Sequence, residues 1–493
     1  MSSKTILLLK RIYFTKNIHW FLLISVFLFL FAPNLLREGM FVDGLWYASI
    51  GNNLANDIGS FWKPMFTATI FKDFYEQPPL SLGIQSLFFK VFGDSFWTER
   101  LYCFVIFLCT IFLIIKIWFL LFNNHKEYKK LFYFPLLIWM VNFEVFFAYP
   151  NNLIECTLTV FLLIAIYYLL KSIVFNNWKS HTYIFVSSLF IFAGFLTKGL
   201  VSLFPLCFFI LYGMIYRNNL LKNISKTFIL IASFLCCLFV LFLFDTPSSF
   251  LINYLETQVL EALNGNRIEN MRDSRFYIIK SLFKGIPISL GIPVILVVIT
   301  YFSKKQKTVL ATSSKNMIVF FLLLGISASA PIMVSLKQAG YYLIPSIPFF
   351  SIAIAIWATP SLLYVREKVK TNKKAYSIYS FCILFLFMLS LFLALKNIGT
   401  IDKRDFESIT DMKEISKYVP NNSTLSLKSD CFEHSLHGIF QRYHFISLDT
   451  TLTNRKYLLI KKNIDTIPIK NYTKSGIITR RFNLYLKTNP LLK

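Results

Sequence analysis

The sequence has little of what marks a soluble, nucleotide-dependent enzyme. Only 15% of its 493 residues are charged, and no glycine-rich nucleotide-binding loop occurs, so a soluble sugar-nucleotide donor has no obvious binding site. The six histidines show no metal-ligand spacing. The looser set His434, His437 and His444 is interpreted as surface histidines. Internal repeats and low-complexity tracts are also absent.

Cysteine provides no disulfide framework. Seven of the eight cysteines fall inside apolar segments, and Cys431 is alone in the polar C-terminal region. We interpret the seven as small buried hydrophobic residues.

Long apolar runs are what the sequence has in abundance. It is 56% hydrophobic and contains 55 phenylalanines. Runs of more than about 17 apolar residues recur, which is the length that a helix needs to cross a bilayer. The first run is not followed by a small-residue cleavage site, so we expect a retained helix. The predicted spans are 19–36, 97–122, 131–149, 152–170, 182–197, 199–216, 227–244, 283–302, 316–336, 340–363 and 376–396.

These spans predict an all-α polytopic membrane protein. A further short or re-entrant helix over 80–92 gives a total of about 11–13 transmembrane helices. We expect two parts: a transmembrane domain, 1–397, with an outer loop at 37–96, and a small extracytoplasmic α/β domain, 398–493. In the second part, a helix over 406–418 is followed by strands. The predicted strands are 423–427, 443–448, 457–461 and 478–486.

The net charge of +26 does not indicate nucleic-acid binding, because the basic residues gather in alternate short loops between the apolar spans. This distribution is typical of membrane topology. It predicts a cytoplasmic N-terminus, and the odd number of spans then places the C-terminal domain outside. The basic positions include Lys4, Lys10, Arg11, Lys16, Lys130, Lys179, Lys222, Lys304, Lys305, Lys307, Arg366 and Lys370.

The outer loop 37–96 carries acids that a simple membrane anchor would not need. We expect an amphipathic helix at the membrane interface from Trp46 to Ile58, with Asp43 at its N-cap. Asp43 could instead, or in addition, act as a general base. Glu76 precedes Gln77-Pro78-Pro79, and the prolines restrict the direction of its carboxylate. The alternative for Glu76 is a solvated loop acid.

Other charged residues stand where apolar spans meet on the predicted outer side. Lys198, Lys337 and Arg275 are candidates to bind a phosphate group, and snorkelling of the lysines to the surface is the alternative. Glu155 opens an apolar helix, where it either supports the helix start or contributes to a site. For Glu99 and Arg100 we favour an ion pair at the interface.

These positions, taken in order, resemble the GT-C membrane glycosyltransferases. The similar group contains the aminoarabinose transferase of lipid A and the protein O-mannosyltransferases. The resemblance covers most of residues 10–350, and its strings are weak individually but specific in their order. They are Asp43 with Tyr47-Ala48, Phe74-Tyr75-Glu76-Gln77-Pro78-Pro79, Glu99-Arg100, Asn151-Asn152 with Glu155, Thr197-Lys198-Gly199, and Lys337 with Tyr342.

The resemblance implies an inverting glycosyltransferase of the cytoplasmic (inner) membrane. It would move a sugar from a polyprenyl-phosphate carrier to a lipid A-like glycolipid, another envelope glycan or a protein. Asp43 and Glu76 match the family's acids. Gln77 stands where relatives often have lysine, which shifts the expected phosphate contacts to Lys198, Lys337 and Arg275. Tyr47, Tyr75, Gln77, Glu99, Arg100, Glu155 and Tyr342 are the expected supporting residues.

Some alternatives remain open at this point. Some relatives bind a divalent metal through a histidine near the Pro-Pro acid; no such histidine is evident, so no metal site is assigned and a divalent metal stays an alternative. A transporter of lipid-linked sugars would require polar groups along a path to both faces. A ligase or polymerase of the O-antigen type would have its large loop later in the chain.

Overall fold

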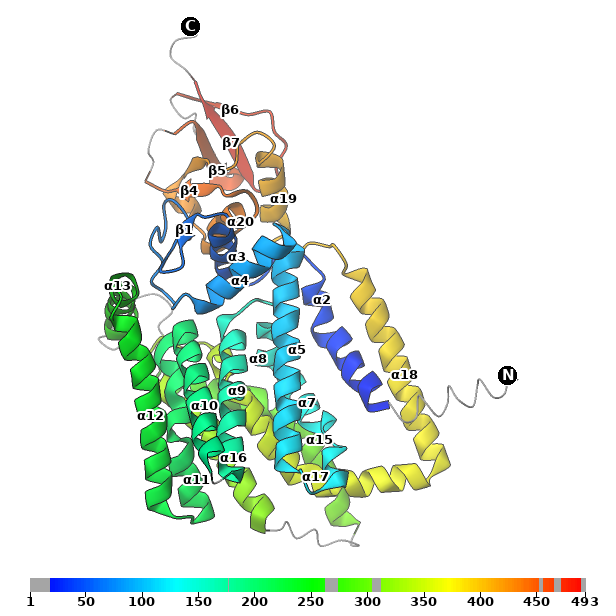
Figure 1. The fold of residues 1–493 in the computed structure, drawn as a ribbon. Helices are drawn as coiled ribbons and strands as arrows, with labels where there is room; N and C mark the ends of the chain where they lie inside the picture. Colours follow the sequence, from blue (N-terminus) through cyan, green and yellow to red (C-terminus); the bar gives the residue numbers. More distant parts are fainter. Residues whose placement is uncertain are drawn as a thin grey trace.

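The computed structural model describes residues 18–175, 177–261, 274–303, 312–451, 455–464 and 471–488. Long helices form the lower part of the molecule and a small sheet lies at the upper end (Figure 1). Eight of the described helical segments are long and apolar enough to cross a membrane. The basic residues at 4–16 and 304–307 lie outside the described residues.

Each predicted span coincides with helical residues, but the eight described segments of spanning length are fewer than the 11–13 predicted. The predicted spans 19–36 and 131–149 fall on shorter helices, and 182–197 and 199–216 fall within Trp178–Tyr216. The first span is the helix Ile18–Leu30, followed by α2 (Ala32–Leu35). The others are α5 (Phe96–Leu121), α7 (Tyr133–Met140) with α8 (Phe143–Ala148), α9 (Ile154–Val174), α10 (Trp178–Lys198), η1 (Gly199–Cys207) with α11 (Phe208–Tyr216), α12 (Leu220–Phe242), α15 (Tyr277–Phe302), α16 (Thr312–Ser329) with η3 (Ala330–Val334), η4 (Gly340–Leu343) with α17 (Ile347–Thr371), and α18 (Lys373–Lys396). Short connecting helices are α6 (Lys126–Lys129), α13 (Asp245–Tyr254) and η2 (Leu255–Leu260).

The chain reverses direction between α10 and η1. Gly199 has φ +63°, a left-handed backbone conformation that ends α10. A Cβ placed on Gly194 would be 3.1 Å from the Ser202 side chain, so η1 lies alongside α10 instead of extending it. The reversal leaves Lys198 at the upper end of the helices.

The predicted outer loop is folded, and its first helix is largely buried. It contains α3 (Val42–Ala55), the short hairpin β1 (Gly59–Ser60) and β2 (Lys63–Pro64), and α4 (Leu80–Phe92). The predicted helix is therefore present, but it does not lie at the membrane interface. All α3 residues from Gly44 to Leu54 except Trp46 are buried, because α3 packs on α4 on one side and on α20 (His434–His444) of the C-terminal domain on the other.

The C-terminal domain is a mixed α/β unit, as predicted. Its strands are β3 (Thr424–Leu427), β4 (Ser447–Asp449), β5 (Tyr457–Lys461), β6 (Tyr472–Lys474) and β7 (Phe482–Lys487), in the order β4-β3-β5-β7-β6. β3 is parallel to β4 and β5, and β7 is antiparallel to β5 and β6. α19 (Phe406–Ile415) and α20 accompany the sheet, with η5 (Ser429–Cys431) and η6 (Lys462–Ile464) as short turns.

Two strand boundaries differ from the prediction. The predicted strand 443–448 begins inside α20, and only Ser447–Asp449 pairs in the sheet. The predicted strand 478–486 begins later, at Phe482. The aromatic residue Tyr443 favoured a strand in the local pattern, but packing of α20 against α3 overrides that local preference.

The C-terminal domain is joined firmly to the outer loop. Met40 and Leu45 belong to the same buried cluster as its core residues. At the connection to α18, Arg37 pairs with Asp402 at 3.2 Å, and Glu38 accepts a 2.6 Å bond from Lys413. The sheet and α20 therefore form a fixed cover over α3 (Figure 1).

Candidate active site

A cavity of about 520 Å³ opens between α3, the segment after β2, the end of α10 and the loop before η4. We call it the α3 cavity. Its charged lining residues are two acids, Asp43 and Glu76, and two cations, Lys198 and Lys337. Tyr47, Gln77 and Tyr342 also line it. Seven of the residues singled out from the sequence thus meet in one cavity, although they come from segments almost 300 positions apart.

Asp43 is the second residue of α3, so it is not the N-cap that the sequence predicted. Phe41 takes the cap position and provides no side-chain hydrogen bond. The first turn of a helix still favours a carboxylate through the macrodipole. The predicted capping role for Asp43 is therefore wrong, and its carboxylate faces the cavity.

The surroundings of Asp43 suit a proton acceptor. Burial raises the pKa of Asp43 above its usual range. A 2.9 Å hydrogen bond from Tyr341 Oη and the charges of Lys198 and Lys337 oppose this shift. The net effect makes the carboxylate a stronger base than a solvated aspartate while Tyr341 fixes its direction.

Lys198 is held inside the protein, so the snorkelling interpretation does not apply to it. Its ammonium forms an ion pair with Glu155, whose side chain is only 1% exposed, while Lys198 is 10% exposed. Its Nζ also lies 4.5 Å from the centroid of the Tyr342 ring. Glu155 thus contributes by fixing a cation at the cavity wall.

Lys337 and Glu76 form a looser pair. Lys337 Nζ is 3.8 Å from Glu76 Oε2, and their side chains are 27% and 19% exposed. The loop that carries Lys337 is anchored by its neighbour Gln338. The Gln338 side chain accepts from Ile278 N at 2.8 Å and donates to Arg275 O at 2.8 Å. This cation is therefore both positioned and accessible to a ligand in the cavity.

Five residues predicted for the site do not line the cavity: Glu155, which lies behind Lys198, and Arg275, Tyr75, Glu99 and Arg100. The Arg275 side chain is exposed, and its link to the site is the backbone carbonyl that Gln338 binds. Tyr75 lies next to Glu76 but packs on Phe250, with ring centroids 5.3 Å apart. The sequence placed Arg275 and Tyr75 in the right segments, but it could not give the direction of their side chains.

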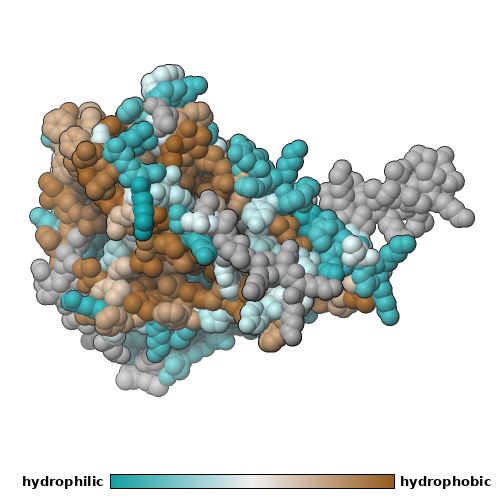
Figure 2. All heavy atoms as spheres, turned by 90° about the horizontal axis from the view of Figure 1, so that it is seen from below, coloured by the Kyte–Doolittle hydropathy of each residue, from teal (hydrophilic) through white to brown (hydrophobic). Residues whose placement is uncertain are grey.

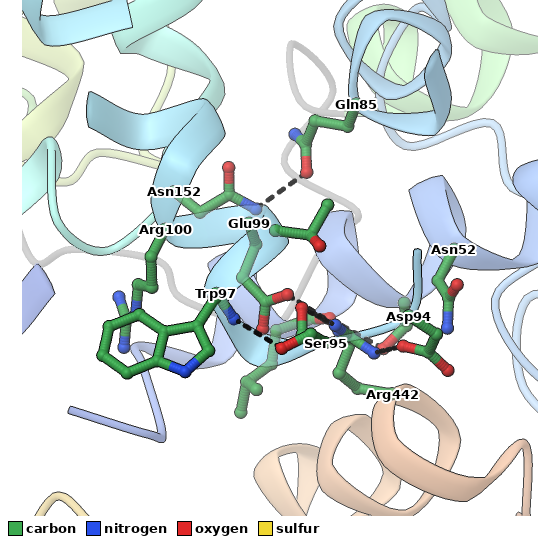
Figure 3. A network of polar contacts seen from close by, with 12 residues as sticks. Asn52, Gln85, Asp94, Ser95, Trp97, Glu99, Arg100, Asn152 and Arg442 are labelled. Carbon is green, nitrogen blue, oxygen red and sulfur yellow. Dashed lines mark hydrogen bonds and ion pairs between the residues drawn. The ribbon is translucent and has the colours of Figure 1, made fainter. Parts of the chain in front are cut away.

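Glu99 and Arg100 are also outside the cavity, and they do not pair with each other. Arg100 donates to the backbone carbonyls of Pro150 and Gly39. Glu99 instead binds Arg442 of α20, with Nη2–Oε2 2.5 Å, and Asp94 binds the same guanidinium at 2.5 Å (Figure 3). The predicted ion pair is corrected to a buried link between the transmembrane part and the C-terminal domain.

Several cavity residues were not found from the sequence as members of the site, and three of them shape its geometry. Tyr341 bonds Asp43, although Tyr342 was the tyrosine singled out. Trp46 and His434 complete the side of the cavity formed by α3 and α20, with ring centroids 5.3 Å apart and Trp46 Nε1 donating to His434 O at 3.1 Å. His434 is exposed, as predicted, but it lies at the cavity because α20 packs on α3. No local pattern in the sequence indicates that packing. The prediction of a surface position is wrong for His437, which is buried in α20.

The described residues do not fit a divalent metal. Within them, no three His, Cys, Asp or Glu side chains gather as metal ligands. Glu76 Oε2 lies 3.8 Å from the ammonium of Lys337, and Asp43 Oδ2 accepts a hydrogen bond from Tyr341. We therefore derive no chemical step through a metal.

Comparison with known proteins supports the fold. A family model described as dolichyl-phosphate-mannose-protein mannosyltransferase matches residues 76–243, about a third of the chain. The crystal structure of ArnT from Cupriavidus metallidurans bound to undecaprenyl phosphate matches with a TM-score of 0.65 at 12% identity, covering 97% of this chain and 99% of that one. The apo structure of the same protein matches at 0.65 and 11% identity, covering 96% and 98%. Comparison with curated proteins found no match.

Proposed function

We propose that this chain, a multi-pass membrane protein with the GT-C fold, is an inverting glycosyltransferase that uses a polyprenyl-phosphate sugar donor. The observation that carries the proposal is the α3 cavity itself. In this cavity the Asp43 carboxylate lies together with the Lys198 and Lys337 cations, which are suited to a phosphate. The fold match to ArnT bound to undecaprenyl phosphate supports the class of donor.

The chemistry follows from the charges in the cavity. When the bond between sugar and phosphate breaks, negative charge grows on the leaving phosphate, and Lys198 and Lys337 stabilise it. Asp43 takes the proton from the acceptor hydroxyl or amine as that group attacks the anomeric carbon. Direct displacement requires the base and the leaving group on opposite faces of the sugar, so the proposed reaction inverts the anomeric centre.

The acceptor in this proposal is a lipid A-like glycolipid, another envelope glycan or a protein. The proposal places the α3 cavity on the outer side of the cytoplasmic membrane, because the basic loops gather at the opposite end of the helices. The carrier's tail stays in lipid while its phosphate enters the cavity. Asp43 and Glu76 are the proposed catalytic pair, with Glu76 orienting Lys337.

The test is transfer of a labelled sugar. Purified protein is incubated with a panel of labelled polyprenyl-phosphate sugars and with membrane lipids or peptides as acceptors. We expect label on an acceptor and a loss of about 10²-fold or more in Asp43→Asn, because the general base is removed. Asp57→Asn is the matched control, since Asp57 lies just after α3 with a side chain that is 94% exposed.

Two results would contradict the proposal. Full sugar transfer by Asp43→Asn at normal expression would exclude Asp43 as the general base. Label that crosses the membrane but stays on the carrier would indicate a transporter of lipid-linked sugars.

A further inference from the structure

A second cavity, of about 750 Å³, lies at the opposite end of the helices, where α17 ends at Thr371 and α18 begins at Lys373. We call it the elbow cavity. Its walls are largely apolar and include Leu137, Leu296 and Leu362. Figure 2 views this lower end and shows a broad apolar surface with hydrophilic side chains among it. The proposed glycosyl transfer does not use this cavity.

The charge of the elbow cavity has one sign. Lys130, Arg366 and Lys370 line it, and no Asp or Glu is among the described lining residues. Two carboxylates stand outside the lining: Glu127, 2.5 Å from Lys130 Nζ, and Glu367, 3.5 Å from Lys370 Nζ. Their side chains are 55% and 62% exposed, so water and salt screen them. The cavity therefore keeps an excess of positive charge.

Arg366 has hydrogen-bond donors that the described residues do not use. Its side chain is only 14% exposed, and its Nε and Nη1 are buried without a hydrogen-bond partner among those residues. The Glu127 carboxylate is 3.9 Å from Nη1, which is beyond hydrogen-bonding distance. Buried donors of a charged group are costly to leave unpaired. Arg366 lines the cavity, and a guanidinium matches the oxygens of a phosphate.

We propose that the elbow cavity binds an anionic membrane phospholipid. Its phosphate binds Arg366 and Lys370, and its acyl chains lie along the apolar wall. The combination of cations and apolar surface selects this ligand, because inorganic phosphate would leave the apolar wall uncovered and a zwitterionic lipid would not neutralise the cations. Basic pockets between membrane helices commonly bind anionic lipids in this way.

The experiment measures lipid binding and does not depend on transferase activity. The full chain is purified in detergent and supplied with phosphatidylglycerol, phosphatidylcholine or inorganic phosphate. Bound lipid is counted by native mass spectrometry and Tm is recorded. We expect phosphatidylglycerol to be retained and to raise Tm, since a ligand of the folded state stabilises it, and we expect neither comparator to do so.

Variants locate the site. Arg366→Gln is expected to weaken phosphatidylglycerol binding about tenfold, because it removes charge-assisted bonds. Lys370→Gln, at a side chain that is 45% exposed, gives a second reading if Arg366→Gln does not fold. Glu127→Gln is expected to strengthen binding, because it removes a nearby negative charge. Lys179→Gln, at an exposed position at the start of α10 at the same end of the helices, is expected to bind normally.

Several outcomes would overturn the proposal. They are equal retention of phosphatidylcholine, a Tm rise with inorganic phosphate alone, or unchanged binding in both Arg366→Gln and Lys370→Gln. A loss in Lys179→Gln as large as in Arg366→Gln would indicate unspecific attraction to the basic end.

Discussion

The α3 cavity and the elbow cavity lie at opposite ends of the same helices and differ in the charges of their lining residues. In the α3 cavity two acids face two cations, and each described charged group there has an identified partner within the chain. In the elbow cavity three cations line the wall without a lining acid. A balanced set of charges can act on a reacting group, whereas an unbalanced set attracts a ligand that supplies the missing charge. The C-terminal domain also covers only the α3 cavity.

The largest effect on this contrast is expected from breaking the buried ion pair that joins the C-terminal domain to the transmembrane part. Arg442→Met leaves Glu99, whose side chain is 0% exposed, without its partner. Breaking a buried pair costs about 3–5 kcal/mol, so we expect a clear fall in Tm and in sugar transfer while lipid binding at the elbow cavity persists. Thermal unfolding and transfer assays measure the effect.

A matched arginine serves as the control for that variant. Arg455 pairs with Asp449 inside the C-terminal domain and is 36% exposed, so Arg455→Met should change Tm less. Adding Glu99→Gln to Arg442→Met should restore part of the stability. If Arg455→Met had the larger effect, the link between the two parts of the molecule would not depend on Arg442.

A smaller loss of transfer rate is expected when one cation of the α3 cavity, Lys337, is replaced. Lys337→Met removes a donor to the leaving phosphate, and such donors are worth about 10²-fold in rate. The side chain is 27% exposed and its partner Glu76 is 19% exposed, so the fold should tolerate the change. The assay is turnover at saturating donor, with Lys63→Met, at the exposed position of β2, as the control. Equal rates in the two variants would remove Lys337 from the phosphate site.

The smallest effect is expected when the hydrogen bond to the proposed base is removed, and it is measured in the pH dependence of the transfer rate. Transfer should fall as the pH drops through the pKa of Asp43, because only the ionised carboxylate accepts a proton; burial places that pKa above the usual value of about 3.9. The Tyr341 hydrogen bond favours the ionised form, so Tyr341→Phe should move the acidic limb of the pH–rate profile to higher pH, with a rate loss of about tenfold at most at neutral pH. Tyr418→Phe, at an exposed position of the C-terminal domain, is the control. A limb that stays in place would mean that Asp43 does not control the profile.

Much of the membrane part could be predicted from the sequence, because hydrophobic run length determines it directly. The predicted spans match helical residues, including the pair joined at Lys198 and Gly199. The tight turn there depends on a single glycine with positive φ, which is a local signal. The α/β character of the C-terminal domain was also predictable from its composition.

The site was predictable as a list of charged residues but not as an arrangement. Asp43, Glu76, Lys198 and Lys337 could be chosen because each is unusual beside an apolar span. Tyr341 and His434 could not, since their roles follow from contacts across almost 300 and almost 400 positions. The same limit explains the misassigned α3 helix: the pattern of Trp46 and Ile50 indicated one apolar face, whereas α20 buries the other.

The start of α3 has a feature that bears on how Asp43 is positioned. Gly44 lies against the backbone of Asn151 so closely that a Cβ would collide with the Asn151 carbonyl. Phe41 N also bonds the Asn151 side chain at 2.7 Å, and Asn152 Nδ2 donates to Gly44 O at 3.1 Å. The backbone of Gly44 contacts the backbone of Asn151 directly, so a change of side-chain rotamer cannot alter the distance between these two segments. A single methyl group at position 44 would displace the helix that presents the carboxylate, without altering any atom that touches a substrate.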